Sequence, residues 1–142
     1  MSQNSTARGS SARMLGVLRP QIYRFKLGSF EVTQILDGFR AGPGPHPTFG
    51  QDQSAETVHN LLKANGLPTT NFEHHFVPAL VNTGRELVLF DTGNGNGRMA
   101  TAGHLRDLVE TAGYTPQQVD AVVITHGHPD HIGGLMHEGK PA

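Results

Sequence analysis

A short apolar segment leads directly into a run of metal-ligand side chains, and this junction limits the fold of the chain more than any other feature. Residues 121–124 read Ala-Val-Val-Ile, and residues 125–131 read Thr-His-Gly-His-Pro-Asp-His. In an extended segment the side chains at i and i+2 point the same way, so His126 and His128 can bind one metal ion together. Ligands of α/β proteins bind at the carboxyl ends of strands. The junction therefore predicts a buried sheet strand that ends in a metal site.

Two further ligand-type residues, Asp130 and His131, follow Pro129 in the same run. The proline ends the extended segment, so we expect Asp130 and His131 in the turn that opens the next helix, where they can face a second ion. An ordinary solvated loop that happens to contain three histidines is the alternative. The density of ligand-type side chains directly after an apolar strand favours the metal site.

The chain contains no cysteine, and this restricts the chemistry of the predicted site. Disulfides, cysteine-based zinc sites and a thiol nucleophile are all excluded. Histidine nitrogens and aspartate oxygens remain, and these ligands suit zinc, with manganese, iron or cobalt as alternatives. We expect two divalent metal ions as cofactors.

Charge and hydropathy exclude several classes of partner. The 11 Lys and Arg nearly balance the 12 Asp and Glu, and no basic run occurs, so the surface expected of a nucleic-acid-binding protein is missing. The longest apolar stretches are far shorter than the roughly 20 residues that cross a bilayer, and no stretch resembles the apolar part of a signal peptide. We therefore expect a cytoplasmic protein with a small-molecule substrate, no nucleic-acid or membrane partner, and self-association into a homo-oligomer as an open alternative.

The remaining sequence predicts one layered domain around this site. The 18 glycines and 9 prolines among 142 residues disfavour an all-helical bundle. Residues 1–20 lack a hydrophobic period and are expected to form a flexible leader, and residues 21–142 are expected to form the domain. The expected order is a hairpin over 22–33, a surface loop over 38–50, a helix from Ser54 to the stop at Gly66, a hairpin over 76–90, a helix over 101–112 and the strand 121–124. Continuous apolar runs at 87–90 and 121–124 are typical of strands covered on both faces. The fold class is α/β, or α+β in layers.

With these motifs in place, the sequence resembles the metallo-β-lactamase-fold hydrolase superfamily. The resemblance depends on His126-x-His128-x-Asp130-His131 after a hydrophobic strand and on Leu-Phe-Asp-Thr-Gly at residues 89–93. Three further segments are similar to the branch that contains methyl parathion hydrolase and related lactonases, namely residues 23–38, 81–84 and 112–120. The similarity covers about residues 20–137.

The resemblance implies an αββα sandwich with a dinuclear metal site, often zinc. It assigns His126 and His128 to one ion, and Asp130 and His131 to the other. It also implies that Asp130 helps to orient the metal-activated water, and that Asp91 supports the metal loop without binding the metal. A simple turn aspartate is the alternative for Asp91.

Members of this superfamily also use a further His, a bridging Asp and a last His from segments farther along the chain. The sequence ends at Ala142 without counterparts of these residues. We therefore expect it to represent the N-terminal half of the fold, and to bind fewer than two ions and show no turnover when alone.

Several functions remain open. The first is a metal-dependent hydrolase of esters, lactones or phosphotriesters that acts through a metal-activated water. A thioester hydrolase of the glyoxalase II kind and a catalytically incomplete metal-binding fragment are alternatives, and a nuclease is disfavoured by the missing basic surface. His74 and His75 are adjacent in an expected strand, so at most one of them could reach the site, and a pocket or surface role is expected for them.

Overall fold

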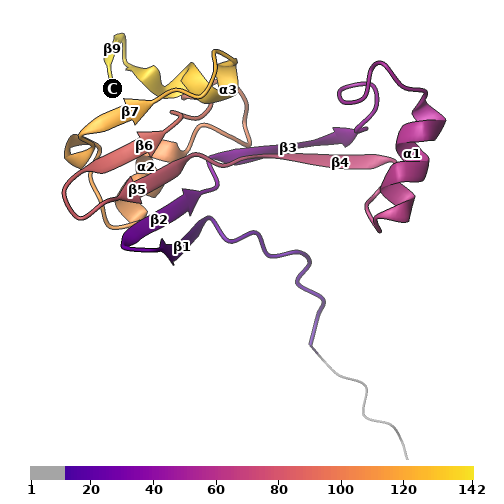
Figure 1. Ribbon diagram of the computed structural model, residues 1–142, viewed down its shortest axis with the longest axis horizontal. Coiled ribbons are helices and arrows are strands. Elements are labelled where there is room, and N and C mark those ends of the chain that lie inside the picture. The colour runs from indigo at the N-terminus through magenta and orange to yellow at the C-terminus, as the bar shows by residue number, and fades with distance from the viewer. Residues whose placement is uncertain (1–11) are drawn as a thin grey trace, which may run out of the picture.

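The computed structural model describes residues 12–142, in which a five-stranded sheet forms the body of the molecule (Figure 1). The strand order in this sheet is β1-β2-β5-β6-β7. Neighbours up to β6 pair antiparallel, and β6 pairs parallel with β7. The five strands are β1 (Ile22–Leu27), β2 (Phe30–Ile35), β5 (Ala79–Asn82), β6 (Leu87–Phe90) and β7 (Ala121–Val123). The mixed α/β class expected from the sequence is confirmed.

Both expected hairpins are present in this sheet. The β1–β2 turn contains Gly28 at φ 62°, a conformation that glycine adopts without steric cost. In the β5–β6 turn, the Thr83 N–H donates to the Glu86 carbonyl at 3.0 Å, and the Gly84 N–H donates to the Asn82 side chain at 2.8 Å. The second hairpin is shorter than expected, because its first strand begins at Ala79.

The expected loop over residues 38–50 is wrong for its first half. Strand β3 (Gly38–Pro43) pairs antiparallel with β4 (Asn71–Phe76), and the two strands form an arm that projects from the body (Figure 1). A two-stranded ribbon has two free edges, so glycines and a terminal proline do not remove hydrogen bonds that a third strand would need. The composition of the segment therefore did not prevent it from forming a strand.

Helix α1 (Ala55–Ala64) lies at the far end of this arm and has the ends that the sequence predicts. The Ser54 side chain accepts a hydrogen bond from the Thr57 N–H at 3.1 Å, as an N-cap residue does. Gly66 follows the helix at φ 66°. The helix has no buried residue, and Leu61 on it is 65% exposed.

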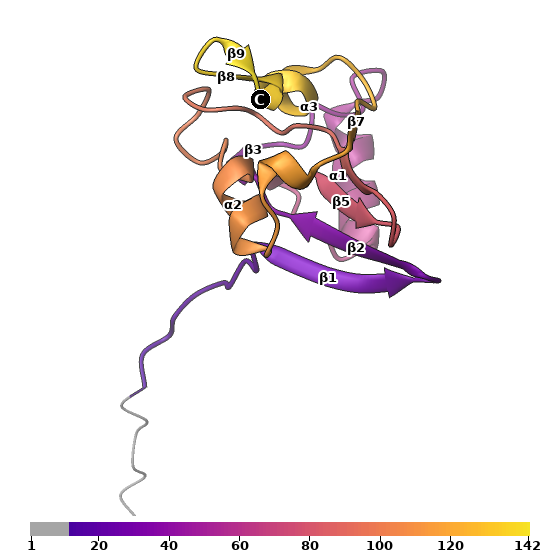
Figure 2. The same cartoon turned by 90° about the vertical axis from the view of Figure 1, so that its left-hand side faces the viewer.

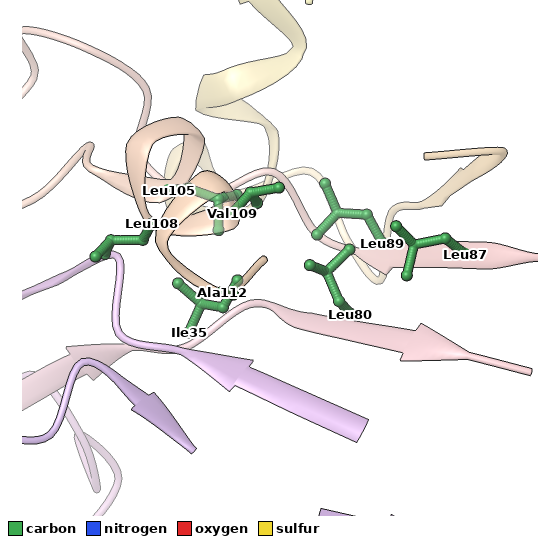
Figure 3. Packing of buried hydrophobic residues seen from close by; sticks show 8 residues of the cluster. All are labelled: Ile35, Leu80, Leu87, Leu89, Leu105, Leu108, Val109 and Ala112. Atoms are coloured by element: carbon green, nitrogen blue, oxygen red, sulfur yellow. The ribbon is translucent and has the colours of Figure 1, made fainter. Parts of the chain in front are cut away.

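The hydrophobic core lies between the sheet and helix α2 (Leu105–Thr111), as Figure 3 shows. The buried residues of this cluster are Ile35, Leu80, Leu87, Leu89, Leu105, Leu108, Val109 and Ala112. Helix α2 begins later than residue 101 because that segment contacts β3 instead: the Phe39 N–H donates to the Thr101 carbonyl at 3.1 Å. Gly103 then adopts φ 95°, which is incompatible with a helix.

The expectation that β6 and β7 are covered on both faces is wrong. Every residue of β7 is exposed, and Phe90 at the end of β6 is 36% exposed. The register places Phe90 and Val123 side by side with Tyr23 and Ala79 in the same row of the sheet. Helix α2 covers only one face of this sheet, and within residues 12–142 no helix covers the opposite face.

Short elements complete the chain, and those after β7 gather at one end of the molecule (Figure 2). Before β7 comes the 3-10 helix η1 (Pro116–Gln118). After β7 come α3 (Pro129–Ile132), the 3-10 helix η2 (Gly133–Leu135), β8 (Met136–His137) and β9 (Lys140–Pro141). No helix within residues 12–142 is long and apolar enough to cross a membrane. Of the expected leader, residues 1–11 lie outside the described residues and residues 12–20 contain no helix or strand, so the proposed domain boundary stays a prediction.

Candidate metal centre

The histidine-rich loop leaves the carboxyl end of β7 and enters α3 at Pro129. His128 is extended, with φ −73° and ψ 149°, and the proline occupies the first turn of the helix. Proline is well suited to this position because its φ is already helical and its missing N–H would have no helical partner there. The change from strand to helix therefore occurs where the sequence predicts it.

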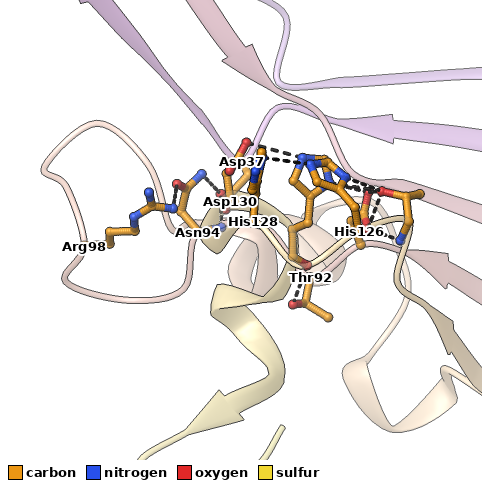
Figure 4. Close-up of polar contacts among 10 residues, drawn as sticks. Asp37, Thr92, Asn94, Arg98, His126, His128 and Asp130 are labelled. Atoms are coloured by element: carbon orange, nitrogen blue, oxygen red, sulfur yellow. Dashed lines mark hydrogen bonds and ion pairs between the residues drawn. The ribbon is translucent and has the colours of Figure 1, made fainter.

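Four side chains of this loop lie close to one another in pairs, and Figure 4 labels three of them, His126, His128 and Asp130. His126 Nε2 lies 3.1 Å from His128 Nδ1, and the rings of His126 and His131 have centroids 3.7 Å apart. The Asp130 Oδ2 atom lies 3.4 Å from His131 Nε2. The structure thus brings together all four residues that the sequence selected, in two close pairs.

Asp91 directly follows β6 and contacts this loop through its carboxylate. Its backbone has φ 62°, an uncommon conformation for a residue with a side chain. Its carboxylate accepts hydrogen bonds from the Thr125 N–H at 2.8 Å and from the Thr125 hydroxyl, and His131 Nδ1 lies 2.7 Å from it. One carboxylate thus contacts both the start of the loop and its last histidine.

The ionisation state of Asp91 determines the tautomer of His131. Burial raises the pKa of the Asp91 carboxyl, but hydrogen bonds from the Thr125 backbone, His131 and the Thr125 hydroxyl outweigh it, so the pKa lies below its ordinary value. An ionised carboxylate can only accept hydrogen bonds. His131 must then donate from Nδ1, which leaves Nε2 as the ring nitrogen that faces Asp130.

The donor atoms of the two pairs have separations that suit metal ligands. Two imidazole nitrogens about 2.0–2.1 Å from one zinc ion would lie roughly 3.3 Å apart in a tetrahedral site. The observed separations of 3.1 Å for His126–His128 and 3.4 Å for Asp130–His131 are close to this value. Within residues 12–142, no group of three or more His, Asp or Glu side chains is arranged to hold a metal ion. The residues fit as pairs of ligands, and their ligand role stays a prediction.

A second buried polar cluster borders the metal loop, and the sequence analysis assigned it no role. Asp37 is fully buried, and its carboxylate accepts hydrogen bonds from the Asn94 N–H and side chain and from the Leu105 N–H. Arg98 in turn donates to the Asn94 side-chain oxygen at 3.2 Å (Figure 4). An aspartate directly after an apolar strand and before a glycine was the available signal.

The other histidine pair, His74 and His75, lies on β4 within the arm. His74 packs against Phe76 with ring centroids 4.8 Å apart, and His75 lies 3.1 Å from the Glu73 carboxylate. Glu73 also forms an ion pair with Arg19. Side chains at neighbouring strand positions point to opposite faces, which accounts for the different surroundings of His74 and His75.

Comparison with known proteins identifies a superfamily over the part of the chain that holds this site. Residues 79–138 match the family model described as the metallo-beta-lactamase superfamily. These residues include β5, β6, β7 and the entire histidine-rich loop. A comparison with curated proteins gives no significant match.

Solved structures extend the similarity to most of the chain. One is described as AidC, a dizinc quorum-quenching lactonase in complex with a product; it is 26% identical, has a TM-score of 0.73, and the match covers 82% of this chain and 40% of that protein. Another, the hydrolase AbOPH of the beta lactamase superfamily, is 27% identical with a TM-score of 0.73, and the match covers 88% of this chain and 42% of the other. The chain therefore spans about two fifths of the length of these structures. Residues 79–138 thus match the metallo-beta-lactamase superfamily model, and solved hydrolases described as dizinc lactonase or beta lactamase superfamily members share the fold of most of the chain.

Proposed function

We propose that this chain carries the first metal-ligand loop of a metal-dependent hydrolase that acts on lactones, esters or phosphotriesters. The observation that carries the proposal is the pairing of donor atoms after β7, His126 with His128 and Asp130 with His131. The dizinc lactonase among the structural neighbours supports both the metal and the reaction class. We also assign the chain to the branch of methyl parathion hydrolase and related lactonases on its sequence resemblance.

In this proposal the residues of the chain hold the site and orient the reactants. His126 and His128 hold one divalent ion, and Asp130 and His131 hold the second. Two such ions, when bound, supply Lewis-acid activation of a water and of the carbonyl or phosphoryl oxygen that is attacked. Asp130 orients the attacking water through its carboxylate, and Asp91 holds His131 in the tautomer that can bind metal.

Metal binding and hydrolysis by purified protein test the proposal. The metal-free 142-residue chain and the full product of its gene would each be titrated with Zn²⁺ and Co²⁺, and bound metal would be counted by elemental analysis. Both are expected to bind metal, and the full product is expected to hydrolyse a lactone or an aryl phosphotriester in a metal-dependent way. Failure of both to bind metal would refute the site. Tight metal binding without turnover of lactone, ester or phosphotriester would favour a protein that only binds metal, and selective thioester hydrolysis would favour the glyoxalase II alternative.

Replacement of Asp91 by alanine is expected to weaken metal binding about 10- to 100-fold, as loss of a group that orients a ligand typically does. The physical reason is that His131 loses the acceptor that fixes its tautomer, and Thr125 loses its partner at the start of the loop. Competition with a chromophoric chelator measures the affinity. Asp107→Ala, at an exposed position on α2, is the matched control. Equal affinity of Asp91→Ala and wild type would exclude the supporting role.

A further inference from the structure

Asp37 is a buried residue that directly precedes β3, the first strand of the arm. None of its side-chain hydrogen bonds is made to the metal loop, which is the histidine-rich loop of residues 125–131. Asp37 lies between the end of β2 and the start of β3 and is 0% exposed. Its Oδ2 atom accepts from the Asn94 N–H at 2.9 Å and from Asn94 Nδ2 at 3.0 Å, and its Oδ1 atom accepts from the Leu105 N–H at 2.8 Å. Three donors therefore converge on one carboxylate and join the turn after β6 to the start of α2.

The turn that Asp37 holds is in direct contact with the metal loop. The Thr92 N–H donates to the His131 carbonyl at 2.7 Å, and the Thr92 hydroxyl donates to the same oxygen at 3.0 Å. The Gly133 N–H donates to the Gly93 carbonyl at 2.9 Å. The position of the segment 92–94 therefore sets the position of the backbone that carries His131.

Close backbone packing leaves this connection little freedom. A Cβ atom on Gly93 would lie 2.8 Å from the Asp37 carboxyl group. A Cβ atom on Gly95 would overlap the Gly133 carbonyl. Cβ atoms on Gly133 and Gly134 would overlap the carbonyls of Asn94 and Thr92 in the opposing loop. Apart from Thr92, whose hydroxyl bonds to residues 131 and 134, these contacts are made by backbone atoms, so a shift of one loop is not readily absorbed by a change of rotamer.

From these contacts we infer that Asp37 is a positioning residue for the metal centre. Its carboxylate holds the segment 92–94, and this segment fixes both Asp91 and the His131 backbone, so that the Asp130–His131 pair is held ready for a metal ion. The inference rests on the proposed function, because it assigns a purpose to this pair. The role is indirect, since Asp37 itself contacts neither the histidines nor Asp130 in the hydrogen bonds described.

The test is the substitution Asp37→Asn, which keeps the shape of the side chain. One of its two acceptor oxygens becomes an NH₂ group, which faces N–H donors of Asn94 or Leu105 and cannot accept from them. We expect Co²⁺ affinity to fall about 10-fold or more, and the visible absorption of each bound Co²⁺ to change, because ligand geometry changes. Where the full product of the gene is assayed for hydrolysis, kcat should fall more than KM rises. The double variant Asp37→Asn/Asn94→Asp moves the carboxylate to the partner position, beside Arg98, and is expected to recover part of the affinity.

Controls separate positioning from folding. Asp120→Asn removes a carboxylate that accepts from the Leu87 N–H at 2.8 Å, at the opposite end of β6 and β7, and should leave the Co²⁺ spectrum unchanged. If Asp37→Asn does not fold, Gly93→Ala perturbs the same contact from the other side and should give the same spectral change. A folded Asp37→Asn protein with the wild-type Co²⁺ spectrum and affinity would overturn the inference.

A measurement without metal distinguishes this inference from the proposed function. The ¹⁵N NMR signals of the His131 ring report its hydrogen bond to Asp91 in the metal-free protein. We expect these signals to move in Asp37→Asn and to stay in place in Asp120→Asn. If the wild type bound no Co²⁺ while the His131 signals still moved, the metal function would fail and the positioning by Asp37 would stand. Unchanged His131 signals in a folded Asp37→Asn would contradict the positioning itself.

Discussion

Replacement of both His126 and His128 by alanine should abolish binding of the metal ion assigned to this pair. Any metal-dependent turnover should fall by more than about 100-fold. Loss of a residue that merely orients a ligand typically costs about 10- to 100-fold in affinity or activity, and loss of two paired ligands must cost more. The pair has its nitrogens 3.1 Å apart, and the removal of one ring also removes the partner of the other. Metal content by elemental analysis and the Co²⁺ spectrum measure the effect.

A matched control for this double variant is available on the arm. His59 lies on the exposed helix α1, away from the loop in sequence and structure, and His59→Ala should leave metal content unchanged. The far-ultraviolet circular dichroism of all variants should be the same, because His126 and His128 are exposed and support no core contact. Retention of wild-type metal content in the double variant would show that the ions bind elsewhere.

Leu80→Ala should destabilise the protein by about 2–5 kcal/mol, the usual cost of a cavity left by a buried leucine. Leu80 is 0% exposed and lies in the middle strand of the sheet, within the cluster that packs against α2. Because small domains have only about 5–15 kcal/mol of stability in total, this loss is a large part of it. Urea unfolding followed by circular dichroism gives the change directly.

The same substitution at an exposed leucine serves as the comparison. Leu61 on α1 is 65% exposed, and Leu61→Ala should change the free energy of unfolding by less than about 0.5 kcal/mol. A loss at Leu80 no larger than at Leu61 would mean that the cluster under α2 does not hold the fold together.

Local signals in the sequence predict much of this fold. Ser54 and Gly66 bound α1, and Pro129 opens α3, because caps and proline act within a few residues of their own position. The spacing of His126 and His128 likewise predicts their convergence, since it depends only on strand geometry. Their role as metal ligands stays a prediction.

Features that depend on distant partners could not be predicted from these signals. The segment Gly38–Pro43 becomes a strand because β4 lies beside it, and its glycine and proline content carries no information about that partner. Apolar runs in β6 and β7 predict strands but do not tell whether a second layer covers them. Asp37 was missed because its acceptor role involves Asn94 and Leu105, which are 57 and 68 residues farther along the chain.

The glycine contacts between residues 92–95 and 133–134 have a thermodynamic consequence for ligand binding. Glycine loses more conformational entropy on folding than any other residue, so the cost of ordering these loops is incurred when the chain folds. Once the backbones are packed together, no long flexible side chain at these glycine contacts remains to be immobilised, and Thr92 is already held by its hydrogen bonds. A ligand that binds at the end of β7 then meets a loop that is already ordered, and little of its binding free energy is lost in ordering the protein.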